Sequence, residues 1–161
     1  MGKRIRVGMA DLNICSAPDS IITLGLGSCV GIILYDRVSK KCGMLHAMLP
    51  DSTKIRNNGL RAKFVDTGLE DLLAMLEKEG VRRSSLVAKV AGGATMFNFS
   101  SSSEISGIGD RNVDAARECL KKYNISIIAE DTGKDYGRTV EFYPETGKFE
   151  IRAVGRDVTF I

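Results

Sequence analysis

Two side chains in the first third of the sequence have the chemistry of a nucleophile and its base. Cys29 follows the small residues of TLGLGS and begins an apolar stretch, and His46, the only histidine, lies in the apolar segment GMLHAMLP. A free thiol has a pKa of about 8.5 and is mostly protonated at neutral pH, so a base must remove its proton before it attacks a carbonyl efficiently. The two residue types therefore indicate nucleophilic catalysis by Cys29 with His46 as general base.

The residues just before Cys29 are small. Gly25, Gly27 and Ser28 allow the backbone to turn tightly and to approach a ligand closely. At such a turn the thiol is reachable and its own backbone N–H points into the same pocket, where one donor to an oxyanion contributes about 2.7–4 kcal/mol. We interpret Gly27 and Ser28 as oxyanion-hole or turn-forming residues.

Other interpretations of these residues stay open. The segment GLGSCVG partly matches a glycine-rich phosphate loop, but its third glycine is displaced and a strand-like segment follows where a helix is required. Cys15, Cys29, Cys42 and His46 are of the types that bind zinc, although no two of the cysteines are closely spaced. A redox sensor would pair Cys29 with Cys15 or Cys42, and a lone histidine in an apolar stretch is often a core residue.

The elements that must position these residues are mostly strands. If Cys29–Tyr35 and Gly43–Leu49 form a hairpin across the polar turn Asp36–Lys41, Cys29 and His46 lie near the same end of it. The turn PETG predicts a second hairpin near the C-terminus. The other strand-like segments are Arg4–Ala10, Ile21–Leu24, Leu86–Ala91, Ile125–Ala129, Arg138–Tyr143 and Lys148–Val154.

Two segments have the 3.6-residue periodicity of amphipathic helices. The first is Leu60–Lys78, closed by Gly80, and the second is Asn112–Tyr123. Strands and helices are mixed and several strands are joined by hairpins, so we predict an α/β layered sandwich with a mixed, mostly antiparallel sheet and two main helices.

A glycine- and serine-rich segment lies between the predicted strand Leu86–Ala91 and the predicted helix Asn112–Tyr123. We interpret residues Gly92–Gly109 as one long loop, and loops of more than about 12–15 residues are often functional. Met96, Phe97 and Phe99 in this loop are candidates for a surface that binds a partner or substrate, with packing into the core as the alternative.

Length and composition narrow the class of protein. The chain has 161 residues, a hydrophobic share of 43% and a charged share of 27%, which fit one globular domain over residues 1–161. Its 23 basic and 20 acidic residues are intermixed, which disfavours nucleic-acid binding. No apolar run approaches the roughly 20 residues that cross a bilayer, and no secretory signal is recognisable. We therefore expect a cytoplasmic protein with reduced cysteines and no membrane insertion.

The motifs named above resemble those of the CheD family of chemoreceptor glutamine deamidases over nearly the whole chain. The most specific segments are TLGLGSCV (23–30) and HAMLP (46–50). Later segments similar to the family are AGGATMF (91–97), GDRN (109–112) and EDTG followed by GRTVEF (130–142). Lys134 departs from the pattern, because we expect the family to favour glycine at this place.

The resemblance implies roles for individual residues and for partners. Cys29 matches the nucleophile, His46 the general base, and Thr23 a third member that accepts the second ring N–H of the imidazole. The implied substrates are glutamines on the helical cytoplasmic part of methyl-accepting chemotaxis receptors, which become glutamates as ammonia is released. Family members are also linked to hydrolysis of receptor methyl esters. No metal or organic cofactor is implied.

The resemblance also implies a protein partner. The family partner is CheC, a chemotaxis phosphatase that CheD binds and stimulates. The alternative function is therefore a regulatory module that docks on a CheC-type phosphatase with little catalysis of its own.

Overall fold

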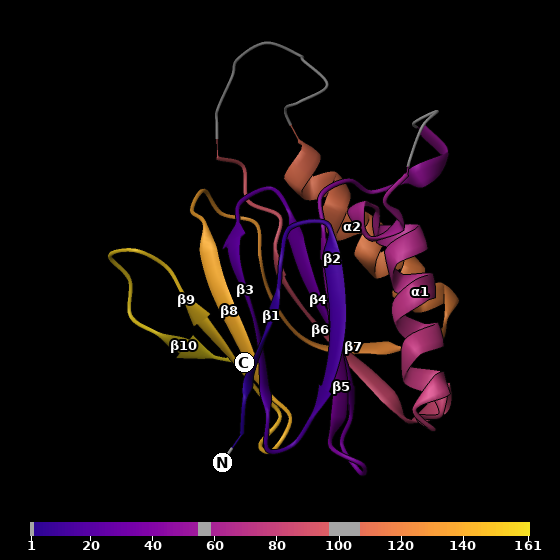
Figure 1. Ribbon diagram of the computed structural model, residues 1–161. Helices are drawn as coiled ribbons and strands as arrows, with labels where there is room; N and C mark the ends of the chain where they lie inside the picture. Colours follow the sequence, from indigo (N-terminus) through magenta and orange to yellow (C-terminus); the bar gives the residue numbers. More distant parts are fainter. Residues whose placement is uncertain (1, 55–58, 97–106) are drawn as a thin grey trace.

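The strands form two five-stranded sheets that lie face to face (Figure 1). The computed structural model describes residues 2–54, 59–96 and 107–161. In spatial order, the first sheet consists of β1 (Arg4–Val7), β3 (Ser20–Leu26), β8 (Arg138–Tyr143), β9 (Lys148–Arg152) and β10 (Thr159–Phe160). The second consists of β2 (Asp11–Ser16), β5 (Lys41–Ala47), β4 (Val30–Asp36), β6 (Leu86–Gly92) and β7 (Ser126–Thr132).

The pairing is mixed and mostly antiparallel, as predicted, but the strands are divided between two sheets instead of one. The pairs β1–β3 and β6–β7 are parallel, and the other neighbours in each sheet are antiparallel. Both predicted hairpins are present. In the first, Val30 pairs with Ala47 and Asp36 with Lys41, and in the second β8 pairs with β9.

Two helices, α1 (Val65–Lys78) and α2 (Ile108–Lys122), cover the face of the second sheet that points away from the first (Figure 1). The second sheet is therefore covered on both sides, which explains why all seven residues of β4 are buried. Ile33 and Tyr35 pack between the sheets, whereas Ile32 and Leu34 pack under the helices. The continuous apolar run of this strand thus reflects its two buried faces.

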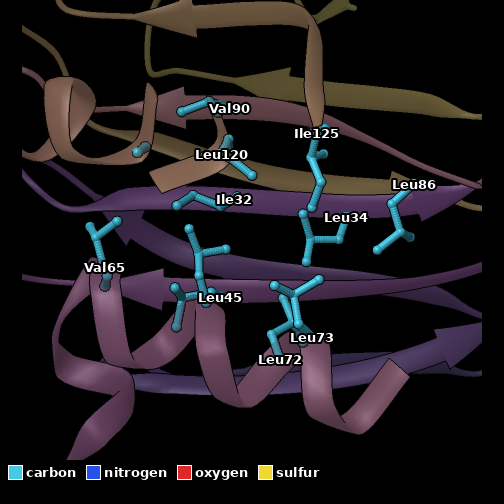
Figure 2. Packing of buried hydrophobic residues seen from close by; sticks show 14 of the residues in the cluster. Ile32, Leu34, Leu45, Val65, Leu72, Leu73, Leu86, Val90, Leu120 and Ile125 are labelled. Carbon is cyan, nitrogen blue, oxygen red and sulfur yellow. The ribbon is translucent and has the colours of Figure 1, made fainter. Parts of the chain in front are cut away.

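The apolar face of α1 carries much of the packing under the helices (Figure 2). Leu69, Leu72, Leu73 and Leu76 are buried at the spacing of one helix face. Each contributes about 1.5–3 kcal/mol through the apolar surface it removes from water. The helix ends at Lys78, and Gly80 beyond it has a left-handed φ of 88°, which matches its predicted role at the helix end.

The first helix begins five residues later than predicted. Phe64 is extended, and it forms an isolated parallel bridge with Leu49, whose carbonyl accepts the N–H of Val65. A separate 3₁₀ turn, η2 (Arg61–Lys63), precedes it, and Leu60 is exposed. The bridge to Leu49 takes the backbone out of helical geometry, so the periodicity over Leu60–Lys78 overstates the helix. Two further 3₁₀ turns are η1 (Ser52–Lys54) and η3 (Arg83–Ser85).

The second helix begins four residues earlier than predicted. Gly107 precedes it with a left-handed φ of 86°, and Gly109 and Asn112 occupy buried positions in its first turns. Neither residue is apolar, so the hydrophobic pattern did not reveal this part of the helix. The edge strand β2 and the two-residue β10 were not predicted either. Within the described residues, neither helix combines the length and apolarity needed to span a membrane.

Candidate active site

Thr23, Cys29 and His46 come from neighbouring strands and point into the space between the two sheets. Thr23 lies on β3 of the first sheet, Cys29 immediately precedes β4, and His46 lies on β5 of the second sheet. Gly31 pairs directly with His46 in the β4–β5 hairpin. Because side chains alternate along a strand, Cys29 is on the same face of the sheet as Gly31. Cys29 is two residues before Gly31, the direct partner of His46, so Cys29 is a diagonal neighbour of His46. The sulfur packs in the cluster between the sheets, as this register requires.

The imidazole of His46 is held by Thr23. Thr23 Oγ1 lies 2.7 Å from His46 Nδ1 and 2.7 Å from the carbonyl oxygen of Val7 on β1. A hydroxyl has one proton, and the carbonyl of Val7 only accepts, so Thr23 donates to Val7 and accepts from Nδ1–H. The neutral ring therefore carries its proton on Nδ1, and Nε2 has a free lone pair.

The surroundings keep His46 unprotonated at neutral pH. The side chain is fully buried, and Nε2 has no hydrogen-bond partner among the described residues. Burial lowers the pKa of His46 to about 4, and the carboxylate of Asp11, its register partner on β2, only partly opposes this effect. The ring is thus a base that is available throughout the physiological pH range.

The thiol of Cys29 is also neutral at rest. Burial raises its pKa, and a hydrogen bond from its own backbone N–H opposes this in part. The residue is 8% exposed, so the sulfur lies at the edge of the core. Proton transfer to His46 would accompany attack, because a resting thiolate is disfavoured in this environment.

The turn before Cys29 is built by glycines on two segments. Gly25 has a left-handed φ of 71°, and its carbonyl accepts the N–H of Gly27, so Gly27 acts here as a turn-forming residue. The segment after β6 closes over this turn. Gly93 donates to the carbonyl of Cys29 at 2.8 Å, and a Cβ atom at Gly92 would lie 2.3 Å from that same oxygen. The glycines of AGGATMF therefore allow the close approach that fixes the backbone of Cys29.

Asn112 was not identified as a site residue from the sequence, although it belongs to the GDRN segment. It is completely buried on α2, and its Nδ2 donates to the carbonyls of Ser28 and Met48 at 2.9 Å each. Ser28, predicted as an oxyanion or turn residue, thus contributes its carbonyl to a helix contact. The feature of the sequence that could have indicated this residue is that Asn112 is polar but occupies an inward position of the amphipathic helix α2.

Of the three candidate surface residues in the glycine- and serine-rich segment, only Met96 belongs to the described part of the chain. It is 44% exposed, and its Cγ lies 3.3 Å from the position that a Cβ of Gly27 would take. Met96 therefore lies against the turn before Cys29 and is open to solvent. Phe97 and Phe99 lie outside the described residues.

The structure also locates the other residues singled out above. Lys134 has a left-handed φ of 65°, a conformation that favours glycine. Cys15 and Cys42 are direct partners in the β2–β5 register, with their sulfurs 3.5 Å apart. All four cysteines are free. In the described part of the chain, no three His, Cys, Asp or Glu side chains are grouped as metal ligands.

A comparison with solved structures shows the fold. A crystal structure of the Neisseria meningitidis protein NMB0706, from the family DUF152, aligns with a TM-score of 0.53 and 10% identity, covering 82% of this chain and 64% of that one. At this identity the likeness extends to the α/β fold alone.

Comparisons of sequence are more specific. A protein of Lachnoclostridium phytofermentans, named probable chemoreceptor glutamine deamidase CheD, is 58% identical over 97% of both chains. A protein of Halalkalibacterium halodurans, named chemoreceptor glutamine deamidase CheD, is 51% identical over 96% of both chains. The family model described as CheD chemotactic sensory transduction matches residues 48–153, more than half of the sequence. Matches of this extent on both counts establish that the chain belongs to the CheD family.

Proposed function

We propose that the chain is a protein-glutamine deamidase of methyl-accepting chemoreceptors, with Cys29 as nucleophile, His46 as general base and Thr23 as the residue that orients the ring. The names of its relatives provide the substrate class. The observation that carries the proposal is the buried Thr23–His46 hydrogen bond, because it leaves the lone pair of Nε2 free. The strand register puts His46 and Cys29 on the same face of the second sheet. We further propose that this activity is cytoplasmic, as the resemblance to the family implies.

The proposed reaction begins with a neutral thiol on Cys29 and a neutral imidazole on His46. His46 Nε2 takes the proton of the Cys29 thiol as the sulfur attacks the side-chain carbonyl carbon of glutamine. The backbone N–H of Cys29 stabilises the oxyanion, and the imidazolium then protonates the leaving nitrogen, so that ammonia departs and a thioester remains. A water molecule gives its proton to His46 and hydrolyses the thioester, which yields glutamate and restores the thiol. The chemistry requires no metal or organic cofactor.

The same site would accept a glutamate methyl ester. The reacting carbonyl carbon occupies the same position in the side chain, and the imidazolium would protonate the departing methoxy oxygen, so that methanol leaves in place of ammonia. We therefore extend the proposal to hydrolysis of receptor methyl esters.

A CheC-type phosphatase is the proposed protein partner. Exposed Met96, beside the turn before Cys29, supports a docking surface next to that turn. A regulatory module without catalysis remains the alternative, but it would have no use for a buried imidazole nitrogen without a partner among the described residues, and such a group costs about 1–3 kcal/mol.

The first experiment measures ammonia release from a purified receptor cytoplasmic fragment. Cys29→Ala should abolish release and leave the unfolding temperature nearly unchanged, because only a small side chain at the edge of the core is lost. Cys119→Ala, which removes a thiol from the helix layer, is the matched control and should retain activity. Ammonia release by Cys29→Ala at the normal rate would exclude the proposed nucleophile. Binding of the phosphatase by Cys29→Ala would separate docking from catalysis.

The second arm of the experiment addresses Thr23. Thr23→Val removes the acceptor of Nδ1–H and should lower kcat by about 10- to 100-fold, by analogy with the loss of partners that orient metal-bound histidines. Thr23→Ser retains the hydroxyl and should recover most of the activity. Equal activities of the Val and Ser variants would show that the hydroxyl has no part in the reaction.

A further inference from the structure

Asn112 is a polar residue in an apolar place. It lies on the buried face of α2, beside Val113 and Ala116, and its side chain has no exposed surface. Burial of an amide is unfavourable unless the amide is hydrogen-bonded. Both N–H groups of Asn112 are bonded, whereas Oδ1 has no partner among the described residues. The interactions of the Asn112 side chain with the described residues are therefore made by its N–H donors.

The orientation of the amide follows from its partners. Ser28 and Met48 both present carbonyl oxygens at 2.9 Å, and carbonyls can only accept. Reversal of the amide would place Oδ1 against two oxygens, so Nδ2 must face them. The two carbonyls lie just beyond the last pair of the β4–β5 ladder, Val30 with Ala47. Asn112 thus joins the ends of the strands that carry the thiol and the imidazole.

The bond to Ser28 acts on the peptide group that contains the N–H of Cys29. In a planar trans peptide the C=O and the N–H point in opposite directions, so fixing the carbonyl of Ser28 toward α2 directs the N–H of Cys29 away from it. A hydrogen bond accepted by the carbonyl also makes the N–H of the same peptide a stronger donor. The next peptide is fixed by Gly93, which donates to the carbonyl of Cys29.

We propose that Asn112 is a positioning residue that orients the Ser28–Cys29 peptide so that its N–H serves as the oxyanion donor. The inference rests on the proposed amidohydrolase reaction, and it assigns to the helix layer a role in that reaction. Asn112 does not touch the substrate in this scheme. It acts through the backbone of the nucleophile, with the bond to Met48 holding the amide in place.

The test compares Asn112→Ala and Asn112→Asp with Leu120→Ala, which removes a buried side chain from the same helix at a distance from the site. Ammonia release from a receptor fragment should show kcat lowered by about 10- to 100-fold with KM unchanged for both Asn112 variants, since loss of a complete oxyanion donor costs about 10²–10³. Leu120→Ala should retain its kcat at a temperature where the protein is folded.

Alkylation of Cys29 by iodoacetamide provides the readout that a purely structural role would not give. Alkylation needs the thiolate but no oxyanion donor, so at a pH where the thiol is fully ionised its rate should be the same in the Asn112 variants and the unsubstituted protein. A parallel loss of alkylation and kcat, or a kcat within twofold of the unsubstituted value, would overturn the inference. If Cys29→Ala still released ammonia, the proposed function itself would fail, and the two failures are thereby distinguished.

Discussion

At the scale of single residues, the proposed chemistry depends on a histidine that burial keeps neutral. The same burial that lowers the pKa of His46 raises that of Cys29, so at rest neither group is charged. A preformed thiolate–imidazolium pair, as found in more polar cysteine sites, is disfavoured here. The thiol would ionise only as it attacks, when the oxyanion donor is in use.

The acid limb of the pH profile should therefore lie unusually low. The proposed base His46 can accept a proton only when neutral, so kcat/KM should be steady from pH 7 to 5 and should decline as the pH falls through about 4. Steady-state ammonia release across this range provides the measurement. A decline centred near 6.5, the ordinary value for histidine, would contradict the burial argument.

The lowered pKa of His46 should also make the free energy of unfolding depend on pH. Between pH 6.5 and about 4 the unfolded chain binds a proton on His46 that the folded chain does not bind, so the free energy of unfolding falls as the pH is lowered through this interval. The full loss corresponds to about 3 kcal/mol. Urea unfolding of the unsubstituted protein and of His46→Gln should differ by this pH dependence, because carboxylates contribute equally to both.

At the scale of elements, the close approach of Gly92 to the backbone of Cys29 predicts an effect of substitution at Gly92 on the candidate site. Gly92→Ala should lower both stability and ammonia release, because its Cβ would lie 2.3 Å from the carbonyl oxygen of Cys29 and must displace it. Gly80→Ala is the matched control, since Gly80 also has a left-handed φ but no atom within 4 Å of its would-be Cβ. It should cost about 1–2 kcal/mol and leave activity unchanged, as seen by thermal unfolding and ammonia release. Equal activities of the two variants would refute the predicted effect.

The elements also show where sequence patterns are informative. The run Cys29–Tyr35 and the turn Asp36–Lys41 predicted the hairpin that places His46, because strand and turn signals there are local. Periodicity could not assign strands to sheets, since the pairing of β3 with β8 joins residues far apart in the chain. The role of Asn112 could not be predicted from the sequence for a related reason. Its partners are the backbone carbonyls of Ser28 and Met48, and the pattern of side chains does not show where backbone carbonyls lie.

At the scale of the whole molecule, the candidate site spans both sheets. Thr23 belongs to the first sheet and His46 to the second, so their hydrogen bond depends on how the sheets pack (Figure 1). The helices contact only the far face of the second sheet. Packing between the sheets should therefore govern catalysis more strongly than packing under the helices, apart from the contact made by Asn112.

Two adjacent residues of β5 test this division. Met44 and Leu45 are both fully buried, but Met44 faces the first sheet and Leu45 faces the helices. Replacement of either by Ala should cost about 2–5 kcal/mol. At a temperature where both variants are folded, Met44→Ala should also lower kcat by about tenfold or more, because small displacements of reacting groups are costly. The same kcat in both variants would show that the gap between the sheets is not critical.

Since His46 is the only histidine of the chain, every imidazole signal in its magnetic resonance spectra comes from this one residue. Its Nδ1 proton is enclosed between two strands and shared with a hydroxyl, which shields it from exchange with solvent. That resonance needs no assignment by mutagenesis. The chemical shift of this proton therefore reports on the candidate site, and its change can be used to follow the binding of a substrate or partner.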